Sequence, residues 1–252
     1  MKNKNDIIWL DSTDSTNNEV KRRFEALDNL SVVSALSQTA GRGQAGNTWE
    51  SADGENLTFS IILKPSEHGP GLKACDQFII SQITSVSIVE FLKCCGIEAE
   101  IKWPNDIYVR DRKICGILIE HSLKADEIYR SIIGIGLNIN QRNFNVTLPN
   151  PTSVFLEKGL RFNIYDMLEE LMRIFRNNWY NYIDGSARHA DICHSYLDLL
   201  WRKDKPYRYI DRKNECEFTG IIRGTGSFGH LIIEKEKGEL EEFAFKEISY
   251  II

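Results

Sequence analysis

The stretch QTAGRGQAGNTWES, residues 38–51, decides between fold classes, because its glycines at positions 41, 43 and 46 spell G-x-G-x-x-G. A dinucleotide-binding fold requires a helix directly after such a motif, with its N-terminus against a pyrophosphate. Here the third glycine is followed by the turn-rich run NTWESADGEN and then by an apolar strand pattern. A kinase-type glycine loop also requires H-R-D and D-F-G strings, and the sequence contains neither. The stretch is therefore predicted to be a mobile loop that belongs to neither class.

Two side chains give this glycine-rich loop a chemical character. Arg42 can pair with an anion, and Trp49 can supply an apolar anchor. Such a loop can fold over an anionic, partly apolar small molecule and exclude water from it. A solvated surface loop is the alternative, and the loop alone does not separate the two interpretations.

The apolar spacing on either side of the loop predicts a mixed α+β domain. We expect strands at residues 7–10, 31–36, 57–63, 97–103 and 129–140, with a hairpin turning at 110–112. Helices are expected from Thr16, where Glu19 completes a capping-box pattern, and over 72–94, 164–183 and 188–201. After residue 202, short strands between glycine and charged turns predict a small β-barrel. The predicted domains are 1–202 and 203–252.

Composition narrows the class of protein further. The 252 residues are 42% apolar and 27% charged with a net charge of −5, which is typical of a globular chain and gives little support to DNA binding. No apolar run approaches the roughly 20 residues of a membrane helix, and none suits a signal peptide. Six scattered cysteines without C-x-x-C are expected to be free thiols. We therefore expect a cytoplasmic protein.

Polar residues also gather where other predicted strands begin and end. In IKWPNDIYV, Pro104 cannot donate to a sheet ladder, so a lysine, an amide and a carboxylate collect at the end of a strand. RKICGILIE begins a strand with Lys113, and its Gly116 leaves room for close approach of a ligand. GIGLNIN places two glycines and Asn138 on another strand. Each pattern alone is better explained by turn chemistry and tight strand packing than by a binding site.

Taken together, STDSTNNEV, QTAGRGQAGNTW, IKWPNDIYV, RKICGILIE and IGIGLNIN resemble the biotin–protein ligases in that family's order and spacing. With the β tail, the resemblance covers nearly the whole chain. It implies a catalytic domain similar to class II aminoacyl-tRNA synthetases and lipoate ligases, namely a mixed sheet flanked by helices, followed by an SH3-like barrel. It also implies an ATP-dependent biotin–[acetyl-CoA-carboxylase] ligase, which makes biotinyl-5′-AMP and transfers biotin to a lysine of a biotin carboxyl carrier domain.

The resemblance further implies a set of site residues. The polar groups of biotin, mainly its ureido ring, would bind Ser15, Thr16, Asn17 and Gln38. The carboxylate and acyl phosphate would lie near Arg42, Gly43, Gln44 and Lys113, with close approach allowed by Gly116 and Gly134. ATP would contact Arg42, Trp49, Lys102, Asn105 and Asn138. Arg42, Lys113 and Asp106 are the expected catalytic residues. Asp106 is also the expected ligand of Mg²⁺, and the resemblance does not separate a role of Asn105 and Asp106 in holding Mg²⁺ from one in orienting the incoming lysine. Cations are required because negative charge builds up at phosphorus and on the leaving group.

One departure from the family pattern concerns the glycine-rich loop. Many members read G-R-G-R, whereas the fourth residue here is Gln44, which keeps hydrogen bonds but loses a cation. The sequence therefore predicts weaker retention of the adenylate unless another cation compensates. The Ser-Thr motif begins at Ser15, so we expect no N-terminal DNA-binding domain and no repressor role. A homodimer is compatible with the resemblance.

Two alternatives remain open at this point. A lipoate or octanoyl ligase or transferase shares the fold, and only the family likeness of GRGQAGNTW and KWPND favours biotin. A binding module is the alternative from another class, with the β tail as an adaptor for peptide or nucleic acid. The tail is close to neutral in charge, which gives no support to nucleic acid.

Overall fold

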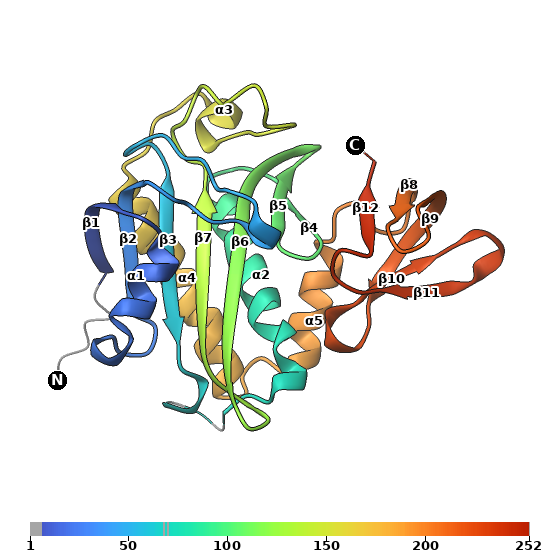
Figure 1. Ribbon diagram of the computed structural model, residues 1–252, viewed down its shortest axis with the longest axis horizontal. Helices are drawn as coiled ribbons and strands as arrows, with labels where there is room; N and C mark the ends of the chain where they lie inside the picture. The colour runs from blue at the N-terminus through green and yellow to red at the C-terminus, as the bar shows by residue number, and fades with distance from the viewer. Residues whose placement is uncertain (1–6, 68, 70, 252) are drawn as a thin grey trace.

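The chain forms two β-sheets with helices packed against the larger one, in a computed structural model that describes residues 7–67, 69 and 71–251 (Figure 1). The larger sheet has the strand order β1-β2-β3-β7-β6-β5-β4. Its strands are β1 (Ile7–Thr13), β2 (Val32–Gln38), β3 (Leu57–Leu63), β4 (Glu100–Lys102), β5 (Asp106–Val109), β6 (Arg112–Lys124) and β7 (Glu127–Leu137). Strands β1 and β2 are parallel and the remaining pairs are antiparallel, which confirms the predicted mixed sheet.

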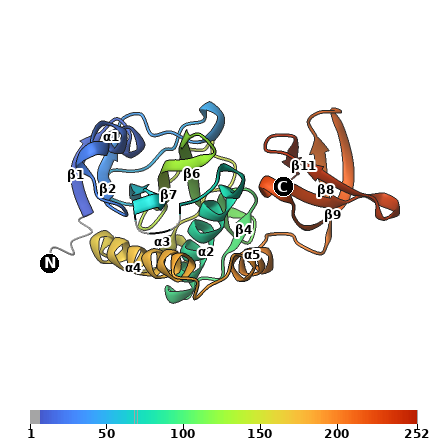
Figure 2. The same ribbon diagram turned by 90° about the horizontal axis from the view of Figure 1, so that it is seen from below.

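Helices pack against both faces of this sheet, with more of them on one face than on the other. Figure 2 shows α2 (Phe78–Cys94), α4 (Ile164–Ile183) and α5 (His189–Asp198) on one side, and α1 (Thr16–Arg22) on the other. The main core lies between the sheet and the three long helices, whereas Val20, Phe24 and Ile62 belong to a smaller cluster under α1. Because side chains alternate along a strand, Phe59 faces the main core while Ser60 faces α1. The α1 side therefore receives the polar side chains of β3.

Shorter helical segments connect these elements. Helix α3 (Val154–Lys158) follows the long loop after β7. The single-turn 3₁₀ segments are η1 (Phe24–Ala26), η2 (Gln44–Gly46), η3 (Pro65–Glu67), η4 (Ala74–Asp76), η5 (Ser227–Gly229) and η6 (Glu236–Gly238). The third glycine of the quoted loop lies in η2, and extended chain follows it, so no α-helix opens there. The exclusion of a dinucleotide-binding turn is confirmed.

The C-terminal strands form a second, antiparallel sheet beside the β4 edge of the first (Figures 1 and 2). Its order is β11-β10-β9-β8-β12, with β8 (Pro206–Asp211), β9 (Cys216–Thr225), β10 (Leu231–Glu234), β11 (Leu240–Phe243) and β12 (Ile248–Tyr250). In the described part of the chain, β11 and β12 remain edges, so the expected barrel is not closed by strand pairing. Trp103 joins the two sheets, because its indole N–H donates to the carbonyl of Gly229 at 2.8 Å.

Several predicted boundaries differ from the structure for local reasons. The helix expected over 72–94 begins only at Phe78, because residues 72–74 bond to the β6–β7 hairpin, where the carbonyl of Leu72 accepts from Ile128. The capping box does not form at α1. Ser15 occupies the N-cap without a side-chain hydrogen bond, and the carboxylate of Glu19 binds Arg22 and Arg23. The strand expected over 97–103 shortens to β4, and the last helix ends at Asp198.

Within the described residues, no helix has both the length and the apolar character that crossing a bilayer demands.

Candidate active site

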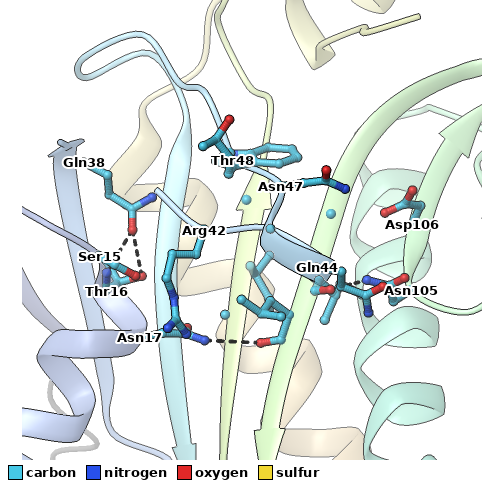
Figure 3. Close-up of a pocket in the computed structure, with 18 of the residues that line it drawn as sticks. Ser15, Thr16, Asn17, Gln38, Arg42, Gln44, Asn47, Thr48, Asn105 and Asp106 are labelled. Atoms are coloured by element: carbon cyan, nitrogen blue, oxygen red, sulfur yellow. Dashed lines mark hydrogen bonds between the residues drawn. The ribbon is translucent and has the colours of Figure 1, made fainter. Parts of the chain in front are cut away.

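A pocket of about 170 Å³ opens on the α1 face of the large sheet, beneath the glycine-rich loop (Figure 3). Most of the predicted site residues line it, namely Ser15, Thr16, Asn17, Gln38, Arg42, Gly43, Gln44, Trp49, Asn105, Asp106, Lys113, Gly116 and Gly134. The loop is folded back on itself, since the amide of Gly43 donates to the carbonyl of Asn47 at 2.7 Å and that of Trp49 to Gly41 at 3.0 Å. The structure thus brings five separate motifs together around one cavity.

Buried hydrogen-bonding groups form one end of the pocket. The side-chain oxygen of Gln38 accepts from the backbone N–H of Thr16 at 2.9 Å and lies 3.3 Å from its hydroxyl, as Figure 3 shows. The hydroxyl oxygen of Ser60 lies 2.7 Å from Thr16 Oγ1 and 2.6 Å from Asn17 Oδ1. Ser15, Thr16 and Asn17 are all buried. A ligand reaching this end meets polar groups that the protein already orients by hydrogen bonds to one another.

Two cations lie further along the pocket, and each is paired with a carboxylate. Arg42 Nη2 contacts Glu120 Oε2 at 2.5 Å, and Lys113 Nζ contacts Asp106 Oδ1 at 2.7 Å. Burial alone would raise the pKa of Glu120, but hydrogen bonds from Lys21, Arg42 and Asn17 together bring that pKa below its ordinary value. Both pairs are partly exposed, so each is worth little to stability. An anionic ligand can therefore draw either cation away at small cost.

Glycines on β6 and β7 make room for side chains of the protein itself. A Cβ atom at Gly136 would lie 2.2 Å from Trp49 Cε2, and one at Gly116 would lie 2.9 Å from Trp49 Cζ3. A Cβ at Gly134 would lie 2.2 Å from Asn17 Oδ1. Gly116 and Gly136 are direct partners in the β6–β7 register, so the indole of Trp49 rests on a flat patch of backbone.

Two predicted residues lie outside the lining of this pocket. Lys102 Nζ donates to the Tyr108 hydroxyl at 2.9 Å and faces the rings of Tyr108, Trp201 and Tyr250 at 4.7, 5.8 and 5.1 Å. Burial there lowers the pKa of Lys102 to about 8. Asn138 is buried, and its side-chain N–H donates to the carbonyl of Thr152 at 2.9 Å.

The donor groups near Asp106 allow a magnesium ion only with help from a ligand. Among the described residues, no three His, Cys, Asp or Glu side chains gather as a metal site. Mg²⁺ bound with a nucleotide commonly takes one or two carboxylates and completes its shell with phosphate and water oxygens. Asp106 and Asn105, which both line the pocket, fit that incomplete donor set.

Other lining residues were not assigned a role from the sequence. They are Asn47, Thr48, Ile117, Leu118, Ile135 and Gly136. Some of these residues could have been predicted, because residues at alternate positions of a strand lie on the same face of the sheet. Leu118 follows Gly116 by two positions on β6, and Gly136 follows Gly134 by two positions on β7. The pairing of Arg42 with Glu120 had no such signal.

The chain belongs to the biotin/lipoate A/B protein ligase family, whose family model matches residues 9–138. The family resemblance of the sequence motifs is thereby confirmed.

The relatives of this chain are named as biotin ligases. It is 30% identical over 233 residues to biotin–[acetyl-CoA-carboxylase] ligase of Paracoccus denitrificans, covering 90% of this chain and 93% of that protein. It is 29% identical over 250 residues to the bifunctional ligase/repressor BirA of Escherichia coli, covering 96% of this chain and 73% of that protein. The structure of biotin protein ligase from Aquifex aeolicus in complex with biotin and ATP is similar, with a TM-score of 0.78, 25% identity and 97% coverage of both chains.

Proposed function

We propose that this protein is an ATP-dependent biotin–protein ligase acting on a biotin carboxyl carrier domain, as a biotin–[acetyl-CoA-carboxylase] ligase. One observation carries the proposal: a single pocket joins a buried hydrogen-bonding end to an end with two cations, Arg42 and Lys113, under a glycine-rich loop. A polar ring linked to a carboxylate suits that arrangement. The similarity to a ligase solved with biotin and ATP supports it.

In the first step, a carboxylate oxygen of biotin forms a bond to the α-phosphorus of ATP, and the bond to pyrophosphate breaks. Arg42 and Lys113 would offset the negative charge that the two anions bring together and that builds up on the leaving group. Asp106 would hold Mg²⁺ against the phosphates, and the ion would supply further charge neutralisation when bound. Trp49 and the loop would exclude water, which protects the acyl–adenylate from hydrolysis.

In the second step, the amine of the acceptor lysine forms a bond to the acyl carbon, and AMP leaves. The acceptor must reach the pocket, and a groove of about 370 Å³ shares Gln44, Asn105 and Ile117 with it. The groove runs towards the C-terminal sheet, where Phe228 and Phe245 are 60% and 41% exposed. Phe228 also has φ of 59°, a strained conformation for a bulky residue. We assign this groove to the approach of the carrier domain.

The two sheets support a division into a catalytic domain of residues 1–202 and a C-terminal domain of 203–252, for which we propose an SH3-like type. The six free thiols suit a reducing compartment and hence the cytoplasm. The homodimer stays a prediction from the sequence, and size-exclusion chromatography with light scattering would test it.

Pyrophosphate release measured with ATP and Mg²⁺ tests the proposal directly. Biotin should stimulate release, whereas lipoate and octanoate at equal concentration should not. Stimulation by lipoate alone would assign the protein to the lipoate branch of the family. No release with any of the three acids, together with no heat of biotin binding in calorimetry, would refute ligase activity altogether.

A further inference from the structure

Glu120 lies just beyond the lining of the pocket and connects the residues on its two sides. It follows Gly116 and Leu118 at alternate positions of β6, so it projects from the same face of the sheet. Its partner in the β6–β7 register is Ile132. The carboxylate is therefore directed at α1 and the glycine-rich loop, and away from the main core.

Three donors from these two elements converge on this carboxylate. Asn17 Nδ2 donates to Oε2 at 2.8 Å, Arg42 Nη2 to Oε2 at 2.5 Å, and Lys21 Nζ to Oε1 at 2.8 Å. Figure 3 shows Arg42 reaching down from the loop to lie beside Asn17. The two cations keep Glu120 ionised, in agreement with its lowered pKa.

An ionised carboxylate fixes the orientation of the amide that faces it. A carboxylate only accepts hydrogen bonds, so the NH₂ group of Asn17 must point at Glu120. The reversed amide would place two acceptor oxygens 2.8 Å apart. Ser60 cannot set this orientation, since a hydroxyl both donates and accepts. The observed amide places Oδ1 against Gly134, which lines the pocket, and 2.6 Å from the Ser60 hydroxyl, which leaves its second lone pair for a ligand.

We propose that Glu120 is a positioning residue that holds the Asn17 carbonyl oxygen towards the pocket and so makes the site select a ligand carrying an N–H group there. The inference rests on the proposed function, because the ureido ring of biotin carries two N–H groups. Glu120 touches no ligand in this assignment and acts through Asn17. The ligand class that it selects is a cyclic urea, in preference to a ring with oxygen in place of nitrogen.

The test compares biotin with its two cyclic carbamate analogues, in each of which one ring N–H is replaced by oxygen. Calorimetry would give dissociation constants for the wild type and for Glu120→Gln. A site with a fixed acceptor should reject one carbamate by about 10²-fold, because the replacement faces two lone pairs at each other. In Glu120→Gln the Asn17 amide can turn and donate, so the discrimination should fall below about 10-fold. A merely structural role would weaken all three ligands equally.

Control variants separate this assignment from general damage. Glu19→Gln makes the same change on α1 at a carboxylate that binds Arg22 and Arg23, and it should keep the wild-type discrimination. The double variant Asn17→Asp with Glu120→Gln reverses the roles, because the introduced glutamine then donates and the introduced aspartate accepts, and it should recover the discrimination. The double variant also tests the proposal if Glu120→Gln alone does not fold.

The outcomes separate a failure of the proposed function from a failure of the role assigned to Glu120. If the wild type binds no biotin, the proposed function itself is wrong. If the wild type binds biotin but accepts both carbamates within about 3-fold, or if Glu120→Gln discriminates as strongly as the wild type, the assignment of Glu120 is wrong and the ligase proposal stands.

Discussion

Replacing Lys113 by alanine should slow adenylate formation severely while hardly changing the fold. The main chain at this position is held independently of the side chain, because the Lys113 amide donates to Asn150 at 2.7 Å and its carbonyl accepts from Thr152 at 2.8 Å. The side chain makes an ion pair with Asp106, in which the two side chains are 31% and 23% exposed. A pair of this exposure contributes at most about 1 kcal/mol to stability, which corresponds to about 2–4 °C in Tm for a chain of this size.

The rate effect should be much larger than the stability effect. Removing one group that stabilises developing negative charge costs about 10²–10³ in rate, or about 2.7–4 kcal/mol of activation free energy. In Lys113→Ala the carboxylate of Asp106 also loses its counterion beside the phosphates, which adds repulsion.

Single-turnover pyrophosphate release at saturating ATP and biotin measures the rate, and thermal denaturation measures the stability. Lys124→Ala, at the end of the same strand, is the matched control and should retain wild-type rates. Adenylate formation by Lys113→Ala within about 3-fold of the wild type would show that this lysine is misassigned. A Tm lowered by far more than about 4 °C would show that the side chain is structural.

Three further predictions concern other parts of the molecule. Gln44→Arg adds a cation to the pocket lining and should slow the dissociation of biotinyl-AMP in a filter or stopped-flow assay; an unchanged rate would mean that Gln44 has no bearing on adenylate retention. Phe228→Ala should raise KM for the carrier domain several-fold yet leave capture of the adenylate by hydroxylamine unchanged, because a small amine needs no docking surface; equal losses in both would contradict the groove assignment. Burial lowers the pKa of Lys102 from 10.5 to about 8, so this lysine costs stability below pH 8 and the cost disappears as the pH rises towards 10.5. Lys102→Met should therefore flatten the rise of Tm between about pH 8 and 10.5 relative to the wild type. Parallel Tm curves for the two proteins would show that Lys102 does not have a lowered pKa in the folded protein.

The sequence was sufficient where one physical signal dominated a segment. The mostly apolar segment LTFSIIL of β3 and the amphipathic spacing of α4 predicted the observed bounds, 57–63 and 164–183. The start of α2 was missed because Leu72 continues the helical spacing but packs beside the β6–β7 hairpin, a contact between distant residues. The open C-terminal sheet was missed as well, since strand spacing predicts strands but not which edges pair.

The candidate site shows the same division between local and long-range information. Local motifs predicted most of the residues that line the pocket, since each motif ends or begins a strand of the same sheet. They did not predict that Lys102 faces Trp201 and Tyr250, which come from the far end of the chain. Nor did they connect Glu120 with Asn17, which is 103 residues away. Which polar side chains meet across such sequence separations depends on the folded structure.

The glycines of β6 and β7 illustrate why a motif can be recognised before its purpose is known. The sequence suggested that Gly116 and Gly134 leave space for a ligand, yet in the structure the space over Gly116 and Gly136 holds the indole of Trp49. The indole N–H is buried there without an acceptor among the described residues, which costs about 1–3 kcal/mol. The apolar contact of the ring with the flat glycine backbone has to offset that cost. A ligand oxygen that accepted from Trp49 would remove the cost, so the same glycines that seat the loop also favour closing it over a ligand that carries an acceptor.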